Sequence, residues 1–144
     1  MKTFEKFLEY KDNLFIEAKK MTTDEIVRKI KSLNLPHGGG QCGNTAIEIN
    51  HKVFGGKGKY IVAVNEFLFD FENEFVGHVA VKYNNQLWDT DGLISMDKLE
   101  SWGQVDPSDS NYTGYFGWTE EDAYKVKIME MTEDQIRKYL PCDN

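Results

Sequence analysis

The sequence has few of the features that mark secreted, membrane-spanning or nucleic-acid-binding proteins. It contains only two cysteines, too few for a disulfide framework. No apolar run approaches the roughly 18 residues that span a bilayer, and the charged first 20 residues lack the apolar core of a signal peptide. The 17 Lys and Arg residues are outnumbered by 24 Asp and Glu, and the formal net charge of −7 argues against binding to nucleic acid or an anionic membrane. The low cysteine content and the lack of a membrane-spanning run or signal-peptide core together predict a cytoplasmic protein.

The length and composition predict one domain with a buried core. The chain has 144 residues, of which 40% are hydrophobic and 28% charged, values that are typical of a soluble globular protein. No internal repeat, linker or low-complexity tract divides it. We therefore expect a single domain over residues 1–144.

Helical patterns fill the first third of the chain. Apolar residues recur at helical spacing over residues 4–20, which predicts one or two amphipathic helices. Residues 22–33 open with a Thr-x-x-Glu capping-box pattern and predict a second helix. A third helical pattern begins at Cys42 and ends at the glycine pair 55–56, a C-cap signal.

Strand patterns follow these helices. Strands are expected over residues 59–64, 77–83, 86–91 and 123–129, and short helices over residues 96–102 and 132–140. Asn84-Asn85 suits a two-residue hairpin turn. The aromatic and acidic stretch 65–76 fits a strand, an edge strand or a substrate-facing loop, and residues 103–118 fit an irregular loop. Helices followed by strands predict an α+β fold with a mostly antiparallel sheet.

The glycine-rich stretch 37–46 places Cys42 at the start of the third helix. Helix N-terminal N–H groups carry partial positive charge, which favours a thiolate over a thiol. Glycines also allow a substrate to approach the backbone closely. Cys42 is therefore a candidate nucleophile. The alternative is an ordinary loop–helix junction in which the cysteine is a small buried apolar residue.

A thiol nucleophile needs a base, and the chain has three histidines. His51 is nine residues beyond Cys42 on the same helix, about 180° around its axis, and points away. His37 is on the glycine-rich loop, a poor platform for a positioned base. His78 opens a strand, which is a rigid support for an imidazole. We expect His78 to be the base.

Two carboxylates on the facing strand are candidates to orient His78. If Asn84-Asn85 is the turn, Asp91 directly faces His78, and Asp89 lies diagonally opposite on the same face. Aspartate is depleted in strands, so strand propensity explains neither residue. The alternative is that residues 89–92 form a simple turn at the strand end.

The order of these residues resembles the papain-like cysteine peptidase superfamily, which includes transglutaminase-like and arylamine N-acetyltransferase-like branches. Gly40-Gln-Cys42 with Ala46 looks like the nucleophile motif of transglutaminase-like proteins. Gly77-His-Val-Ala-Val and Leu87-Trp-Asp-Thr-Asp-Gly92 look like the strands that carry the histidine and the acid. The resemblance covers residues 37 to about 92. It implies a nucleophile helix packed on an antiparallel sheet.

The resemblance also bears on the third triad residue and on the oxyanion hole. In papain-like enzymes a glycine follows the third member by three residues, which selects Asp89, with Asp91 in reserve. These enzymes carry an oxyanion glutamine several residues before the cysteine, where this chain departs from the pattern. The backbone N–H of the nucleophile with Gln41, Asn34 or His37 is left to stabilise an oxyanion.

The residues and the resemblance together predict a cysteine-dependent hydrolase or acyl transferase. It would act on an amide bond of a protein or peptide through Cys42, His78 and Asp89, with no cofactor. One alternative is a catalytically inactive acidic protein that binds or inhibits a basic partner through residues 67–75. Another is a metal site made by the cysteine, the histidine and the two aspartates, although no paired Cys or His spacing supports zinc.

Overall fold

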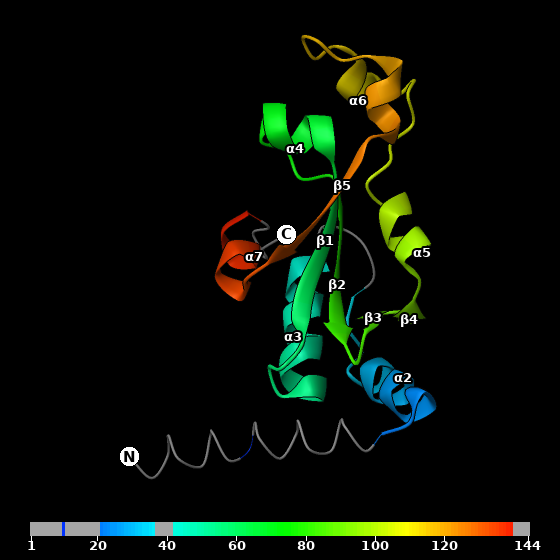
Figure 1. Ribbon diagram of the computed structural model, residues 1–144, viewed down its shortest axis with the longest axis vertical. Helices are drawn as coiled ribbons and strands as arrows, with labels where there is room; N and C mark the ends of the chain where they lie inside the picture. Colours follow the sequence, from blue (N-terminus) through cyan, green and yellow to red (C-terminus); the bar gives the residue numbers. More distant parts are fainter. Residues whose placement is uncertain (1–9, 11–20, 37–41, 140–144) are drawn as a thin grey trace.

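The computed structural model describes Tyr10, residues 21–36 and residues 42–139. These residues form an α+β arrangement built on one five-stranded sheet (Figure 1). The sheet has the order β4-β3-β2-β1-β5, and every neighbouring pair is antiparallel. The strands are β1 (Lys59–Asn65), β2 (Gly77–Tyr83), β3 (Gln86–Asp89), β4 (Gly92–Ile94) and β5 (Val126–Met131). The coarse α+β prediction is confirmed, with an antiparallel sheet.

The helices lie before, between and after these strands. They are α2 (Thr23–Ser32), α3 (Cys42–Phe54), α4 (Glu66–Glu72), α5 (Met96–Ser101), α6 (Ser110–Thr113), the 3-10 helix η1 (Glu120–Tyr124) and α7 (Glu133–Tyr139). The longest helix among the described residues, α3, has 13 residues, and none of those described is long and apolar enough to cross a bilayer. The amphipathic helices predicted over residues 4–20 lie outside the described residues except at Tyr10.

Local signals predicted several helix ends correctly. The Thr22 hydroxyl accepts a hydrogen bond from the Glu25 N–H at 3.2 Å and so caps α2. Thr132 and Gln135 bond reciprocally at the start of α7. Helix α3 ends at Phe54, and Gly55 follows with a φ of +62°, in the left-handed region that glycine tolerates best. These contacts span at most four residues, so the sequence alone contains the information for them.

The predictions for residues 65–76 are wrong. The segment begins with a helix, α4, because the side chain of Asn65 caps it by accepting a hydrogen bond from the Leu68 N–H at 3.2 Å. Phe67 and Leu68 face inward and are buried. Phe71 is four residues from Phe67, and their rings lie 5.6 Å apart, the helical i,i+4 spacing. The dense aromatic composition resembles a strand pattern and conceals this helical spacing.

Two strand boundaries also differ from the prediction. The strand expected over 86–91 ends at Asp89, and Gly92–Ile94 returns beside it as β4. The last strand begins at Val126, because Ala123 belongs to η1. A tight turn interrupts the first predicted run, and a 3-10 helix occupies the start of the second.

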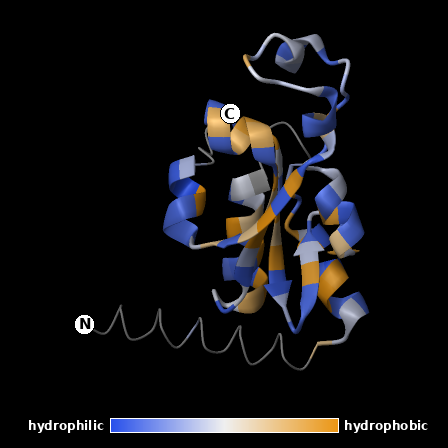
Figure 2. Ribbon diagram, turned by 45° about the horizontal axis from the view of Figure 1, so that its top comes forward, coloured by the Kyte–Doolittle hydropathy of each residue, from blue (hydrophilic) through white to orange (hydrophobic). Residues whose placement is uncertain are grey.

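The two faces of the sheet pack against different helices. Alternate strand residues such as Val62, Val79 and Val81 belong to a buried cluster with residues of α2, α3 and α7. The intervening residues, such as Ala63 and Ala80, belong to a second cluster with Leu99 of α5. In Figure 2 the hydrophobic colour gathers on the strands and on the helix faces toward them. Because side chains alternate along a strand, each residue's register decides which helix it meets.

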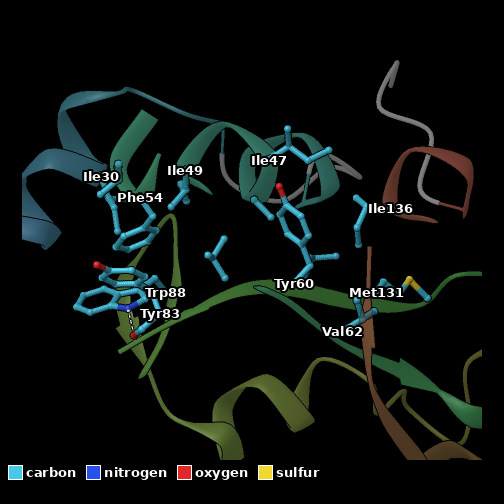
Figure 3. Packing of buried hydrophobic residues seen from close by; sticks show 14 of the residues in the cluster. Ile30, Ile47, Ile49, Phe54, Tyr60, Val62, Tyr83, Trp88, Met131 and Ile136 are labelled. Carbon is cyan, nitrogen blue, oxygen red and sulfur yellow. Dashed lines mark hydrogen bonds between the residues drawn. The ribbon is translucent and has the colours of Figure 1, made fainter. Parts of the chain in front are cut away.

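Aromatic side chains fill the end of the core nearest the β2–β3 turn. Trp88 is fully buried and donates its indole N–H to the Tyr83 carbonyl at 3.2 Å (Figure 3). Phe54 stacks on Tyr83 with ring centroids 4.4 Å apart and lies 6.1 Å from the Trp88 ring. Asn84 and Asn85, both at positive φ, form the predicted hairpin turn beside this cluster. The turn holds β2 and β3 in register.

Glu133 joins α7 to α3 and β1. Its Oε1 accepts a hydrogen bond from the Tyr60 hydroxyl at 2.9 Å and contacts Nε2 of His51. Burial acts to raise the pKa of Glu133, but the hydrogen bonds from His51 and Tyr60 outweigh it, and the pKa lies below its ordinary value. The ionised carboxylate therefore stabilises the folded protein.

Glu133→Gln should lower the free energy of unfolding near neutral pH by about 0.5–1 kcal/mol, a value discounted because Glu133 is about one-third exposed. A depressed carboxylate pKa gives stability that is present above the unfolded pKa and lost as the pH falls through the folded one. Urea unfolding from about pH 7 to pH 3 measures this. The gap between the two proteins should close at the acid end, and a gap that persists there would contradict the assignment.

Candidate active site

His78 is held on β2 by close contact with β1. It is the second residue of the strand and pairs with Ala63. A Cβ on the preceding residue, Gly77, would lie 1.8 Å from the Ala63 carbonyl oxygen, so only glycine allows this approach of the two strands. The His78 side chain is 15% exposed. The imidazole therefore sits on a rigid support and still reaches solvent.

Asp89 is the carboxylate that contacts His78. Its Oδ2 lies 2.8 Å from Nε2 of His78, and its side chain is 5% exposed. Its Oδ1 accepts the Asp91 N–H at 2.8 Å. Since an ionised carboxylate can only accept, Nε2 carries the proton in this bond. Both oxygens are engaged, which fixes the orientation of the carboxylate and of the imidazole.

Asp91 lies elsewhere because the chain turns after Asp89. Asp89 pairs with Gly92 across β3 and β4, so Asp91 is in the hairpin turn and not on a strand. Its carboxylate is about half exposed and lies 3.3 Å from Nζ of Lys98. The position predicted for Asp91 by hairpin register, directly opposite His78, is wrong for this reason. The Asp89 carboxylate serves both the turn and the histidine.

Trp102 covers His78 on one side, a contact that the sequence did not predict. The residue ends α5, and its ring stacks on the imidazole with centroids 5.0 Å apart and planes 29° apart. Trp102 is 45% exposed. Its place beside a residue 24 positions earlier depends on how α5 crosses the sheet, for which no local pattern exists.

The other predicted residues fall in three groups. Helix α3 begins at Cys42, whose side chain lies outside the described part of the structure, as do His37 and Gln41. Asn34 follows α2 at a φ of +53° and lines a hollow with Thr90 and Asp91. His51 lies against Glu133 of α7.

Chain direction brings the beginnings of α3 and β2 to the same end of the molecule. Helix α3 packs on β2 and is joined to β1 by the short segment 55–58. Because β1 and β2 are antiparallel, α3 and β2 run in the same direction (Figure 1). His78 and Asp89 belong to the face of the sheet that meets α5, and α3 covers the other face. The start of α3 and His78 therefore lie toward the same end of the sheet, on opposite faces of it.

The described residues contain no group of three or more His, Cys, Asp and Glu side chains arranged to hold a metal ion. Comparisons with protein-family models, with curated proteins and with solved structures find no match to this chain. The functional assignment therefore depends on the chemistry of these residues.

Proposed function

We propose that the protein is a cysteine-dependent hydrolase or acyl transferase that acts on an amide bond of a protein or peptide. Cys42 is the nucleophile, His78 the general base and acid, and Asp89 the residue that orients His78. The fold proposed for this reaction is a papain-like or transglutaminase-like core. The observation that carries the proposal is the hydrogen bond from Nε2 of His78 to the buried Asp89 carboxylate.

That hydrogen bond supports catalysis because it leaves the proton exchange to the other ring nitrogen. With Nε2 directed at Asp89, His78 would exchange a proton with the thiol through Nδ1. The buried carboxylate stabilises the imidazolium that forms when the thiol ionises. The N-terminal end of α3 favours the thiolate in addition.

The first half of the reaction forms a thioester. The Cys42 thiolate attacks the carbonyl carbon, a carbon–sulfur bond forms, and the carbonyl electron pair moves to oxygen. The oxyanion then reforms the carbonyl, the carbon–nitrogen bond breaks, and the imidazolium of His78 gives its proton to the departing amine. Oxyanion stabilisation comes from the backbone N–H of Cys42 with a second donor, for which Gln41, Asn34 and His37 are the candidates.

The second half releases the acyl group. His78 takes a proton from water, and the resulting hydroxide attacks the thioester carbonyl. The carbon–sulfur bond then breaks, the imidazolium of His78 returns its proton to the sulfur, and the carboxylic acid product loses its proton to solvent. In a transferase, an amine takes the place of water and forms a new amide. The same three side chains serve both outcomes, so access of water or amine decides between them.

The test is the rate at which iodoacetamide alkylates Cys42, measured against pH in a Cys142→Ser background. We expect Cys42 to react at about pH 6 as a thiolate, whereas a free thiol has a pKa of about 8.5. His78→Ala should move the profile toward that free value and slow the reaction near pH 6 by about tenfold or more. Peptide mass spectrometry assigns the label to Cys42.

The single Cys42→Ser variant supplies the control, since it retains Cys142 and reports how an ordinary thiol of this chain reacts. If Cys42 and Cys142 show the same pH profile, or if His78→Ala leaves the profile of Cys42 unchanged, the proposal is wrong.

A further inference from the structure

Two segments form an acidic–aromatic lobe at one end of the sheet, residues 66–74 and residues 103–124. Together they contain nine Asp and Glu residues and none of the 17 Lys and Arg of the chain. Since the formal net charge of the whole chain is −7, the remainder of the chain is slightly positive. The lobe also holds eight of the 19 Phe, Tyr and Trp residues, namely Phe67, Phe69, Phe71, Tyr112, Tyr115, Phe116, Trp118 and Tyr124. Negative charge is thus concentrated where aromatic side chains are concentrated.

Specific contacts join the two segments of the lobe to each other and to the sheet. The Tyr115 hydroxyl donates to Oε2 of Glu74 at 2.6 Å, and Phe67 meets Trp118 edge to face at 5.2 Å. The buried side chain of Asn65, at the end of β1, donates to the Asp122 carbonyl at 2.9 Å. Figure 1 shows α4 and the segment around α6 at the same end of the sheet. These contacts hold the two segments against each other and against the sheet, so the acidic–aromatic lobe forms one continuous surface.

A groove of about 710 Å³ crosses this lobe. Its apolar lining comes from Phe67, Phe71 and Phe116, and the Phe71 and Phe116 side chains are 74% and 99% exposed. Glu72 and Glu121 also line it, together with the ion pair between Asp122 and Lys125. Exposed phenyl rings that line one groove are an unfavourable surface for an isolated protein, and such apolar patches mark interaction sites.

We propose that this groove binds a basic segment of another polypeptide, one that carries arginines next to apolar side chains. An arginine guanidinium stacks on aromatic faces and bonds carboxylates with its planar fork, so one side chain uses both features of the groove. Apolar neighbours in the same segment cover the two phenyl rings. Nucleic acid and anionic membranes carry the same sign of charge as the lobe and are repelled.

The groove lies close in the fold to His78. Strand β1 ends at Asn65, which caps α4, and His78 pairs with Ala63 two residues earlier. A bound segment is thus held at the end of the sheet that carries the imidazole. The binding itself rests on the acidic–aromatic lobe and does not depend on the reactivity of Cys42, so the two proposals fail separately.

The experiment measures binding by fluorescence anisotropy with a fluorescein-labelled synthetic peptide of alternating Arg, Leu and Ser residues. We expect the wild-type protein to bind it, and the affinity to fall as NaCl rises because the charges are exposed. Phe71→Ser with Phe116→Ser should weaken binding by about tenfold, and so should Glu72→Gln with Glu121→Gln. The two phenylalanines are exposed, so their replacement leaves the core intact.

Matched controls replace exposed residues outside the lobe. Leu93→Ser with Met96→Ser removes two exposed apolar side chains, and Asp97→Asn with Glu100→Gln removes two exposed carboxylates. Both should bind the peptide as the wild type does. The proposal is overturned if no peptide binds at low salt, if a peptide with Glu in place of Arg binds equally, or if the lobe variants bind as tightly as these controls. The proposal is also overturned if sedimentation shows that the chain forms a dimer in which a second copy occupies the groove.

Discussion

Asp89→Ala is expected to reduce turnover of an amide substrate by about a hundredfold or more. The change removes the carboxylate that orients the His78 imidazole and stabilises its protonated form. The pH profile of Cys42 alkylation should move toward that of a free thiol, a readout that a purely structural role would not change. Asp89→Asn should retain part of the activity, since an amide oxygen can still accept the Nε2 proton. Stability should fall by about 1–3 kcal/mol in the alanine variant, because the N–H of Asp91 loses its acceptor.

Asp91 provides the matched control for this experiment. Its carboxylate is about half exposed and pairs with Lys98, so Asp91→Ala should change stability by less than about 0.5 kcal/mol and turnover by less than about twofold. If Asp91→Ala loses as much activity as Asp89→Ala, turnover does not depend on the hydrogen bond between His78 and Asp89.

Trp88→Ala should be the most destabilising single change considered for this protein. The side chain is fully buried, packs near Phe54 and donates its indole N–H to the Tyr83 carbonyl. Removal of a buried tryptophan costs about 3–5 kcal/mol, because the cavity it leaves is only partly refilled. In a domain of this size the thermal midpoint should fall by about 10 °C, as followed by circular dichroism.

Trp102→Ala is the control for the loss of a tryptophan. Because Trp102 is 45% exposed, its removal leaves no internal cavity and should cost less than about 1 kcal/mol. The two variants differ in burial and not in the residue replaced. Equal destabilisation by both would mean that the Trp88 cluster is not the main apolar core of the sheet.

The candidate site could be predicted from the sequence only in part. The sequence predicts His78 from its position on a strand, and the resemblance to papain-like enzymes selects Asp89 through the glycine three residues later. Hairpin register alone preferred Asp91, because it assumes that the strand continues. The strand stops at Asp89, and the turn that ends it is stabilised by the same carboxylate that contacts His78.

Helix α4 shows a second reason why the sequence predicts the structure only in part. Its cap, Asn65, and its i,i+4 pair, Phe67 and Phe71, were present in the sequence. Four phenylalanines within nine residues suggested a strand or loop, since aromatic residues favour strands. What decides the helix is the capped end of β1 together with burial of Phe67 and Leu68.

The sequence alone determined the features that depend on neighbours within about four positions. These are the Thr22 cap of α2, the capping box of α7, the glycine after α3, and the two-residue turn between β2 and β3. The tertiary structure alone decided the contacts between distant residues, including His78 with Trp102, Glu133 with Tyr60, and the two segments of the acidic–aromatic lobe. The physical reason is that such contacts depend on how the helices cross the sheet, and the crossing is set by the packing of the whole core.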